Sequence, residues 1–262
     1  LSSSSAASDV YKRQAKDIIE RYMPYNDKIK YVQNEKNIGA ENNFKKCIDV
    51  ASGEYIWMIA DDDLLFDYSL DLIMEQKFDF DILLVNWSLY SNDFLSLIKK
   101  NVLPKYKKRP DDKNDILSHF SSRLSFISSV MFKKSLFNKK VRNIYDSLIP
   151  YQLSFLALAY SIIDDSPKIS FLERPLIMQR GDNDPYLTDN TTFFYNVFSD
   201  GIYFFHEEIS KLGYSDSAIR DSLKSSFYIF IWKDLINRKI KKNNYKFAFS
   251  NSYKNYSHIF SL

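Results

Sequence analysis

The feature that most constrains the fold is an alternation of strand and helix patterns over residues 30–87. Runs of strand character at Lys30–Gln33, Tyr55–Ile59 and Asp81–Trp87 are separated by segments with helical spacing. The third run, DILLVNW, is almost continuously apolar, which is typical of a strand covered by helices on both faces. This alternation predicts an α/β domain with a mostly parallel sheet.

Two helices are expected between these strands. The apolar residues of the first recur at helical spacing, namely Ala40, Phe44, Cys47, Ile48 and Ala51. They predict an amphipathic helix over Ala40–Val50, with a turn at Asn37–Gly39 before it and Gly53 as its terminator. Asp67 is expected to cap a second helix that ends near Gln76.

The pattern loosens beyond Tyr90, and the chain begins with one short helical stretch. A basic loop containing Pro104 and Pro110 is expected over Lys99–Lys113. The other expected elements are helices at Ala15–Met23, Asp115–Phe120, Asp146–Ile163, Thr191–Lys211 and Asp216–Lys239, a strand at Ser125–Phe132, and an extended segment at Ile169–Gln179.

Composition excludes several classes of protein. The net charge of +3 is too small to indicate nucleic-acid binding, and no apolar run reaches the roughly 18–20 residues that a membrane span needs. The single cysteine, Cys47, excludes an internal disulfide framework and fits a reducing compartment. We therefore expect a cytoplasmic protein.

Three adjacent aspartates, Asp61, Asp62 and Asp63, follow the Tyr55–Ile59 strand directly. Neighbouring carboxylates repel one another, so they persist side by side when a cation or strong hydrogen-bond donors neutralise them. Carboxylate oxygens suit a hard divalent cation that keeps sites for water and phosphate. The alternative is a solvated acidic turn in which one aspartate caps the next helix.

The stretch NIGAENNFKKCIDVASGEYIWMIADDDLL resembles family 2 glycosyltransferases with the GT-A fold. The Asn-x-Gly, Ala-x-Gly-Glu-Tyr-Ile and acidic metal motifs of that family stand here at Asn37–Gly39, Ala51–Ile56 and Asp61–Asp63. The variant YIWMIADDD and the later RPLIMQRGDN, Arg174–Asn183, look most like the abequosyltransferase-like branch. The resemblance implies a Rossmann-like sheet that binds a nucleotide-sugar, followed by a mainly helical C-terminal part.

The chain departs from the family in three places. Ala60 occupies the first acidic position of the metal motif, and Phe44 and Lys45 replace an Arg-Asn pair that many members carry. Nothing before Lys30 matches the family's first strand–helix–strand unit. The opening LSSSSAASDVYKRQ reads like a translated adapter, with a disordered natural leader as the alternative. We therefore expect a non-native leader at 1–14, a truncated, poorly active GT-A domain at 15–185, and a helical extension at 186–262.

The resemblance also implies roles for the aspartates. Asp62 is the expected ligand of Mg²⁺ or Mn²⁺, Asp61 lies near the metal or the donor ribose, and Asp63 supports the site or caps a helix. The ion bridges the donor diphosphate and neutralises the leaving group.

Five further residues are candidates, each with a structural alternative. Asp146 is the expected catalytic base, or else the N-cap of an apolar helix. Asn43 is expected to contact substrate, or to bond its own loop. Arg180, with Gly181 and Asn183, is expected to contact the diphosphate, or to lie in a surface loop.

The implied acceptor is a glycan or a polyprenol-linked glycan in the synthesis of a bacterial surface polysaccharide such as O-antigen. Basic and aromatic residues alternate from Arg220 to Leu262, which favours peripheral contact with the inner face of the cell membrane, or else packing of the last helices. The rival functions are an inactive relic of such an enzyme and another metal-dependent phosphoryl enzyme.

Overall fold

A computed structural model describes residues 20–22, 29–106, 112–166, 168–181, 194–232, 235–236 and 256. The leader expected at 1–14, most of the helix expected at Ala15–Met23, and Asn183 lie outside these residues. Only Glu20–Tyr22 of that first helix are described, and they are helical. The part of the chain that the structure describes contains no helix long and apolar enough to cross a membrane.

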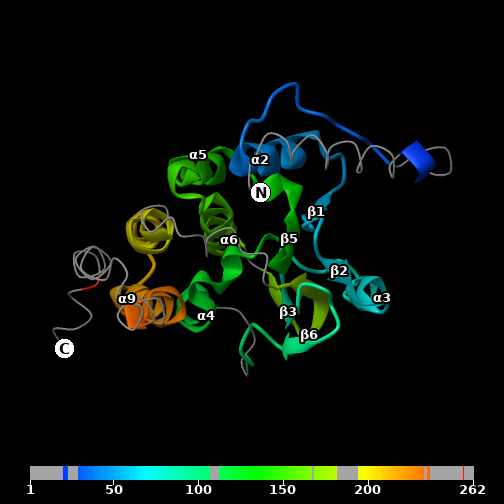
Figure 1. Ribbon diagram of the computed structural model, residues 1–262. Coiled ribbons are helices and arrows are strands. Elements are labelled where there is room, and N and C mark those ends of the chain that lie inside the picture. The colour runs from blue at the N-terminus through cyan, green and yellow to red at the C-terminus, as the bar shows by residue number, and fades with distance from the viewer. Residues whose placement is uncertain are drawn as a thin grey trace.

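One mixed sheet forms the centre of the molecule (Figure 1). Its strands are β1 (Tyr55–Trp57), β2 (Leu64–Leu65), β3 (Ile82–Tyr90), β4 (Leu97–Lys99), β5 (Val130–Lys133) and β6 (Ile169–Arg180). The order is β1-β5-β3-β6-β2, and β4 pairs with the far end of β3. Strands β3 and β6 are parallel, with Ile82 opposite Ile169 and Tyr90 opposite Arg180.

The expectation of a mostly parallel sheet is wrong. Strand β5 lies between β1 and β3 and pairs antiparallel with both. Strand β2 is also antiparallel to β6, and β4 to β3. Apart from the β3–β4 hairpin, strands that follow one another in sequence are not neighbours in the sheet, because β5 and β6, which come later in the chain, lie between β1, β3 and β2.

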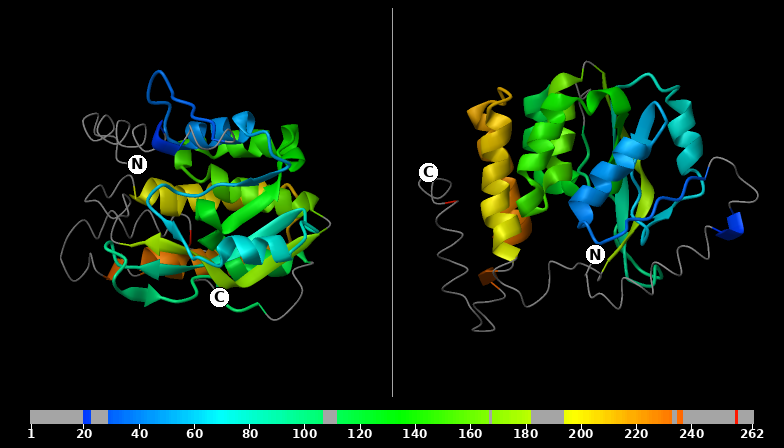
Figure 2. Two further views of the ribbon diagram at one scale, coloured as in Figure 1. Left: turned by 90° about the vertical axis from the view of Figure 1, so that its right-hand side faces the viewer. Right: turned by 90° about the horizontal axis from the view of Figure 1, so that it is seen from above.

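Helices cover both faces of this sheet (Figure 2). Helix α3 (Ser69–Glu75) lies on one side, and α6 (Ser154–Asp165) and α4 (Lys113–Phe120) lie on the other, with α8 (Ile202–Ser210) and α9 (Asp216–Ser226) outside them. Helix α2 (Ala40–Val50) lies beside α5 (Lys139–Ser147). This sandwich explains why Ile82 to Ser88 of β3 are all buried.

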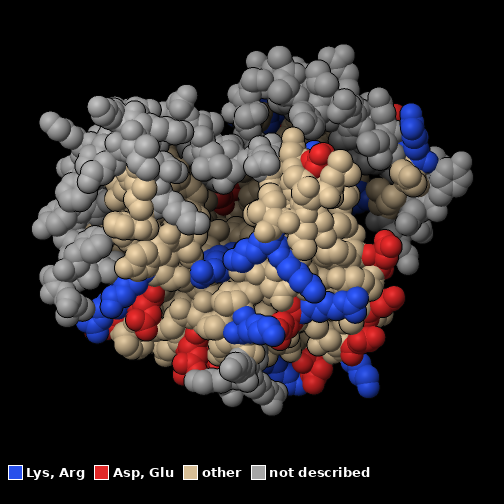
Figure 3. Space-filling model, turned by 60° about the horizontal axis from the view of Figure 1, so that its bottom comes forward, with Lys and Arg blue, Asp and Glu red and all other residues tan. Residues whose placement is uncertain are grey.

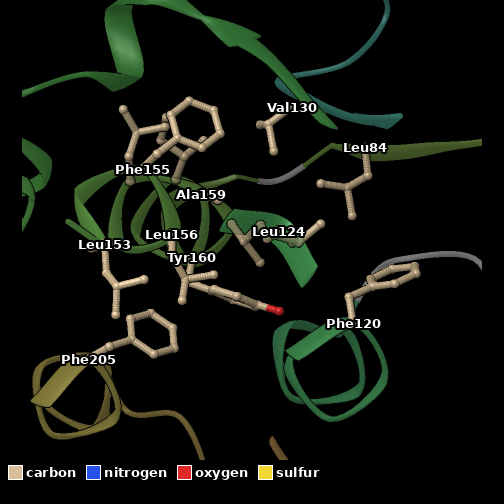
Figure 4. Packing of buried hydrophobic residues seen from close by; sticks show 14 of the residues in the cluster. Leu84, Phe120, Leu124, Val130, Leu153, Phe155, Leu156, Ala159, Tyr160 and Phe205 are labelled. Atoms are coloured by element: carbon tan, nitrogen blue, oxygen red, sulfur yellow. The ribbon is translucent and has the colours of Figure 1, made fainter. Parts of the chain in front are cut away.

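The hydrophobic core lies between the sheet and α6 (Figure 4). Every residue of α6 from Ser154 to Ile163 is buried. Tyr160 extends from α6 toward α4, where its hydroxyl donates to the carbonyl oxygen of Ser121 at 2.7 Å. Its ring centroid lies 5.6 Å from that of Phe205 of α8. The C-terminal helices therefore share one core with the sheet.

Several short elements complete the chain. They are 3₁₀ turns at Ser121–Ser125, Ile127–Ser129, Lys134–Leu136 and Ile149–Tyr151, and π-helical segments at Asn196–Gly201 and Phe227–Trp232. Half of the strand expected at Ser125–Phe132 is thus 3₁₀, and only its end, from Val130, enters β5.

The helix expected over Asp146–Ile163 is two helices, α5 and α6. Pro150 has no N–H to continue a helix, and Gln152 has the left-handed φ of 56°. Asp146 therefore lies in the last turn of α5 and caps no helix, which removes the structural role expected for it.

Helix α2 spans the residues expected of it. The buried face of α2 differs from the expected apolar face at two positions. Cys47 is exposed, whereas Glu41 is 7% exposed and faces inward. The carbonyl of Cys47 accepts from the N–H of Ala51, which has extended backbone angles and ends the helix. Gly53 is thus not the terminator, because Ala51 turns the chain before it.

Two other local expectations are wrong. Residues Ile29–Asn34 have no regular structure, so the strand expected at Lys30–Gln33 is absent, and the described part of the chain pairs no strand with it. The N-cap of α3 is Tyr68 rather than Asp67, because the chain pairs as β2 with β6 before the helix starts.

Candidate active site

The three aspartates form a turn between β1 and β2. The N–H of Asp63 points to the carbonyl of Ala60 at 3.4 Å, and the N–H of Ala60 donates to the hydroxyl of Ser128 at 3.2 Å. Leu64 and Leu65 then pair with Met178 and Ile177 of β6. This pairing brings the aspartates to the carboxyl end of β6, which sequence alone did not indicate.

Arg180, the last residue of β6, is attached to this acidic turn. Its main-chain N–H donates to Oδ1 of Asp63 at 3.0 Å, and its Nε donates to the main-chain oxygen of Asp62 at 3.1 Å. Its guanidinium carbon lies 5.0 Å from the centroid of the Phe94 ring. The structure therefore joins Asp62, Asp63 and Arg180, three of the predicted site residues.

The environment of Asp63 disfavours its negative charge. Burial raises the pKa of this carboxyl to about 6, the hydrogen bond from Arg180 opposes the shift, and the neighbouring charges of Asp62 and Asp61 add to it. Its Oδ2 is buried without a hydrogen-bond partner in the described structure. An oxygen in this state suits a bound cation, which would supply the missing charge.

The divalent metal that the resemblance implies fits this turn if a bound diphosphate supplies further ligands. The described residues contain no group of three or more His, Cys, Asp or Glu side chains arranged to hold a metal ion. Mg²⁺ and Mn²⁺ sites in phosphate-transferring proteins commonly use one or two carboxylates, with phosphate and water as the other ligands. Asp62 and Asp63 would supply two carboxylates to such a site.

Asp146 and Asn43 make contacts outside the acidic turn. Both carboxylate oxygens of Asp146 accept from Nζ of Lys45, at 2.6 and 2.7 Å, so this residue joins α5 to α2. Oδ1 of Asn43 accepts from the side-chain amide of Asn34 at 2.8 Å, which is the local bond given above as its alternative. Asp61 is exposed at the start of the acidic turn.

Phe94 and Ser128 shape the site and were not predicted from the sequence. Ser128 also accepts the indole N–H of Trp57 at its main-chain oxygen, at 2.9 Å, so it holds the chain on the approach to the aspartates. Neither residue stands in a motif, and both reach the site through chain segments far from it in sequence.

Residues 8–136 match the family model described as Glycosyl transferase family 2. This segment is therefore similar to family 2 glycosyltransferases. The match begins at residue 8, inside the stretch for which a non-native leader is expected.

Two curated relatives support a glycosyltransferase. The uncharacterized glycosyltransferase MJ1057 of Methanocaldococcus jannaschii is 26% identical over 133 residues, which are 49% of this chain and 46% of the relative. The abequosyltransferase RfbV of Salmonella typhimurium is 26% identical over 179 residues, 62% of this chain and 52% of the relative. The chain thus spans about half the length of each relative.

Solved structures of TarS from S. aureus share the fold. TarS 1-349 has a TM-score of 0.55 and 16% identity, over 83% of this chain and 59% of that one. The same TarS fragment in complex with UDP-GlcNAc has a TM-score of 0.55 and 15% identity, over 83% of this chain and 61% of that one. The chain therefore has an α/β GT-A fold, as the resemblance implied.

Proposed function

We propose that the protein transfers a sugar from a nucleotide-diphosphate donor to a glycan or lipid-linked acceptor. The observation that carries this proposal is the acidic turn of Asp61–Asp63 joined to Arg180. A carboxylate pair for a divalent ion beside a guanidinium group suits a diphosphate, whose charge both can neutralise. The TarS complex with UDP-GlcNAc supports a nucleotide-sugar as the donor class.

Asp62 and Asp63 are the residues that would hold Mg²⁺ or Mn²⁺, with Asp61 at the rim toward the donor ribose. The bound ion would neutralise the leaving nucleoside diphosphate. Arg180 keeps its Nη groups for phosphate oxygens while its Nε and main-chain N–H hold the turn in place. Asn183, three residues further on, is proposed as a second donor contact.

Asp146 is the proposed base that accepts the proton of the acceptor hydroxyl. It has to part from Lys45 to do so, because Lys45 donates to both of its oxygens. Asn43 is proposed to contact the donor by exchanging its bond with Asn34 for one to the substrate.

The likeness to RfbV favours a bacterial surface polysaccharide such as O-antigen as the product. An acceptor of that kind on a polyprenol carrier would place the enzyme at the inner face of the cell membrane. Most of the C-terminal stretch for which we expect membrane contact, Arg220–Leu262, lies outside the described residues.

The test is titration of UDP-, CDP-, GDP- and dTDP-sugars into the protein with and without Mn²⁺, followed by a transfer assay. We expect one donor class to bind in a metal-dependent way, and Asp62→Ala to abolish the low transfer activity expected of this chain while the thermal unfolding midpoint stays within a few degrees. Removing one of three adjacent carboxylates relieves repulsion, so the apoprotein should keep its stability.

The matched control is Asp71→Ala, which removes an exposed carboxylate of α3 outside the turn. This variant should bind and transfer as the wild type does. Wild-type turnover by Asp62→Ala contradicts the metal assignment, and turnover of phosphate esters without any glycosyl transfer contradicts the proposed function.

A further inference from the structure

Strands β3 and β4 form a hairpin, residues Tyr90–Lys100, whose tip is well ordered by its own bonds. The N–H of Ser91 donates to the carbonyl of Ser96 at 2.8 Å. The carboxylate of Asp93 accepts from the hydroxyl of Ser91 at 2.6 Å and from the N–H of Leu95 at 3.0 Å. These hydrogen bonds give the tip of the β3–β4 hairpin a defined conformation.

This ordered hairpin presents aliphatic side chains to water. Leu95 is 84% exposed, Ile98 is 53% exposed and Leu97 is 50% exposed. Three large aliphatic residues within four positions of one hairpin are unusual on a surface that has no partner. Their exposure indicates that something apolar covers them.

Basic residues follow these side chains directly. Lys99 and Lys100 are exposed at the end of the hairpin, and Lys105 is exposed five residues later. From Ser91 to Arg109 the sequence has six Lys or Arg and one acid, Asp93. Figure 3 brings forward the lower side of the molecule, where Lys and Arg side chains form a band across the middle of the face with Asp and Glu side chains beside it.

The hairpin also borders the candidate active site. The N–H of Gly181 donates to the carbonyl of Tyr90 at 2.8 Å, and a Cβ at Gly181 would lie 3.3 Å from Cδ1 of Ile98. The ring of Phe94, next to Leu95, makes a cation–π contact with the guanidinium of Arg180. A surface that the hairpin enters would therefore lie next to the acidic turn.

We propose that the β3–β4 hairpin docks on an anionic lipid bilayer, with Leu95, Leu97 and Ile98 in the headgroup region and the lysines on lipid phosphates. Aliphatic side chains at the tip and lysines behind them match the two layers of such a surface, apolar inside and anionic outside. A second copy of the chain fits less well, because pairing two hairpins would bring Lys99 and Lys100 of both copies together.

If the proposed function holds, docking of the β3–β4 hairpin on a bilayer also limits the kind of acceptor. The donor site would open at the bilayer surface, so the acceptor would be a membrane-held amphiphile rather than a free glycan. Binding to vesicles needs no donor or acceptor, so it can be tested separately from transfer.

The experiment is sedimentation of the 262-residue chain with phosphatidylcholine vesicles that contain or lack phosphatidylglycerol, at low and high salt. We expect binding only with phosphatidylglycerol, weakened by salt because exposed charges are screened within roughly 8 Å at physiological ionic strength. Lys99→Gln with Lys100→Gln should lower the partition coefficient about thirtyfold. Leu95→Ser with Leu97→Ser should lower it at least about tenfold.

Two control pairs separate this surface from others. Lys36→Gln with Lys139→Gln removes two exposed lysines near α2 and α5 and should leave binding unchanged. Tyr228→Ser with Trp232→Ser removes exposed aromatics of the C-terminal stretch Arg220–Leu262, and it should also leave binding unchanged if that stretch follows its packing alternative rather than contacting the membrane. All variants are compared at equal thermal stability, which exposed positions should preserve.

Three results would overturn the proposal. They are wild-type vesicle binding by both hairpin variants, loss of binding in the Tyr228 and Trp232 pair instead, and a hairpin-dependent change of oligomeric state without vesicle binding. If vesicles bind as expected and no donor does, the hairpin assignment stands and the proposed function is wrong.

Discussion

At the scale of single residues, Glu41 has the most unusual environment outside the site. Its carboxyl is buried where α2 faces α5 and α6, close to the hydroxyls of Tyr145 and Ser154. Burial raises the pKa of Glu41 to about 7, and the nearby hydroxyls of Ser154 and Tyr145 oppose this shift. The Tyr145 hydroxyl donates to the main-chain oxygen of Glu41 at 2.6 Å, and Oε2 of Glu41 has no hydrogen-bond partner in the described structure. The uncharged carboxyl is therefore the form that the folded protein prefers.

This preference predicts that the variant Glu41→Gln is more stable than the wild type by an amount that depends on pH. A raised folded-state pKa stabilises the wild type below its unfolded value of 4.5, and that contribution is lost as the pH rises through 7. Glutamine resembles the uncharged form at every pH. The variant should gain about 2 kcal/mol of unfolding free energy relative to wild type between pH 5 and pH 8. Denaturant unfolding at pH 5 and pH 8 measures the stability of the variant and the wild type. A stability difference that is the same at both pH values contradicts the prediction.

At the scale of elements, α2 and α5 are joined by ion pairs that span the sequence. Lys45 of α2 pairs with Asp146 of α5, and Asp49 pairs with Arg142. Asp146 lies in the last turn of α5, where the helix dipole disfavours a negative charge, so Lys45 offsets that cost. Such exposed pairs contribute at most about 1 kcal/mol each.

Asp146→Asn and Lys45→Met break the same pair, so together they separate a structural role from a catalytic one. Each variant should lose at most about 1 kcal/mol of unfolding free energy. If Asp146 is the base, Asp146→Asn should lower kcat at least about a hundredfold, whereas Lys45→Met should change kcat less than about threefold. Similar kcat values for the two variants would show that Asp146 only joins the helices.

At the scale of the whole molecule, a buried polar network fastens the C-terminal helices to the rest. Nε2 of His206 in α8 lies 2.8 Å from the hydroxyl of Ser222 in α9, which donates to the hydroxyl of Ser121 at 3.0 Å. Ser226 of α9 donates to Ser122 at 3.0 Å. Since these bonds lie within the shared core, we expect the helices and the sheet to unfold as one unit.

This network makes the protein sensitive to acid. Burial lowers the pKa of His206 to about 4, and the hydrogen bond to Ile202 opposes that shift. The unfolded chain takes up the proton first, so stability is full above pH 6.5 and falls as the pH drops toward 4.

The free energy of unfolding of the wild type should fall by about 2 kcal/mol more between pH 7 and pH 5 than that of the variant His206→Gln. Unfolding curves at both values give the comparison, with Glu41→Gln as the background, because the titration of Glu41 acts in the opposite direction over the same range. Parallel pH profiles with and without His206 would show that this residue does not set the acid sensitivity.

The sequence by itself determined the features that depend on local pattern. The limits of α2, the two-faced burial of β3 and the position of the acidic motif follow from periodicity and residue type within short windows. The resemblance to family 2 glycosyltransferases could also be recognised there, because the motifs that carry it lie close together in one stretch. These features need no knowledge of what packs against them.

Only the tertiary structure decided how those elements meet. It inserted β5 and β6 among earlier strands, broke the expected helix at Pro150, and set Arg180 against Asp63 across 117 positions of the chain. It also turned Glu41 inward and paired Lys45 with Asp146. The physical reason is that strand partners and buried charges are chosen by packing between distant segments, and local periodicity carries no information on which segments will meet.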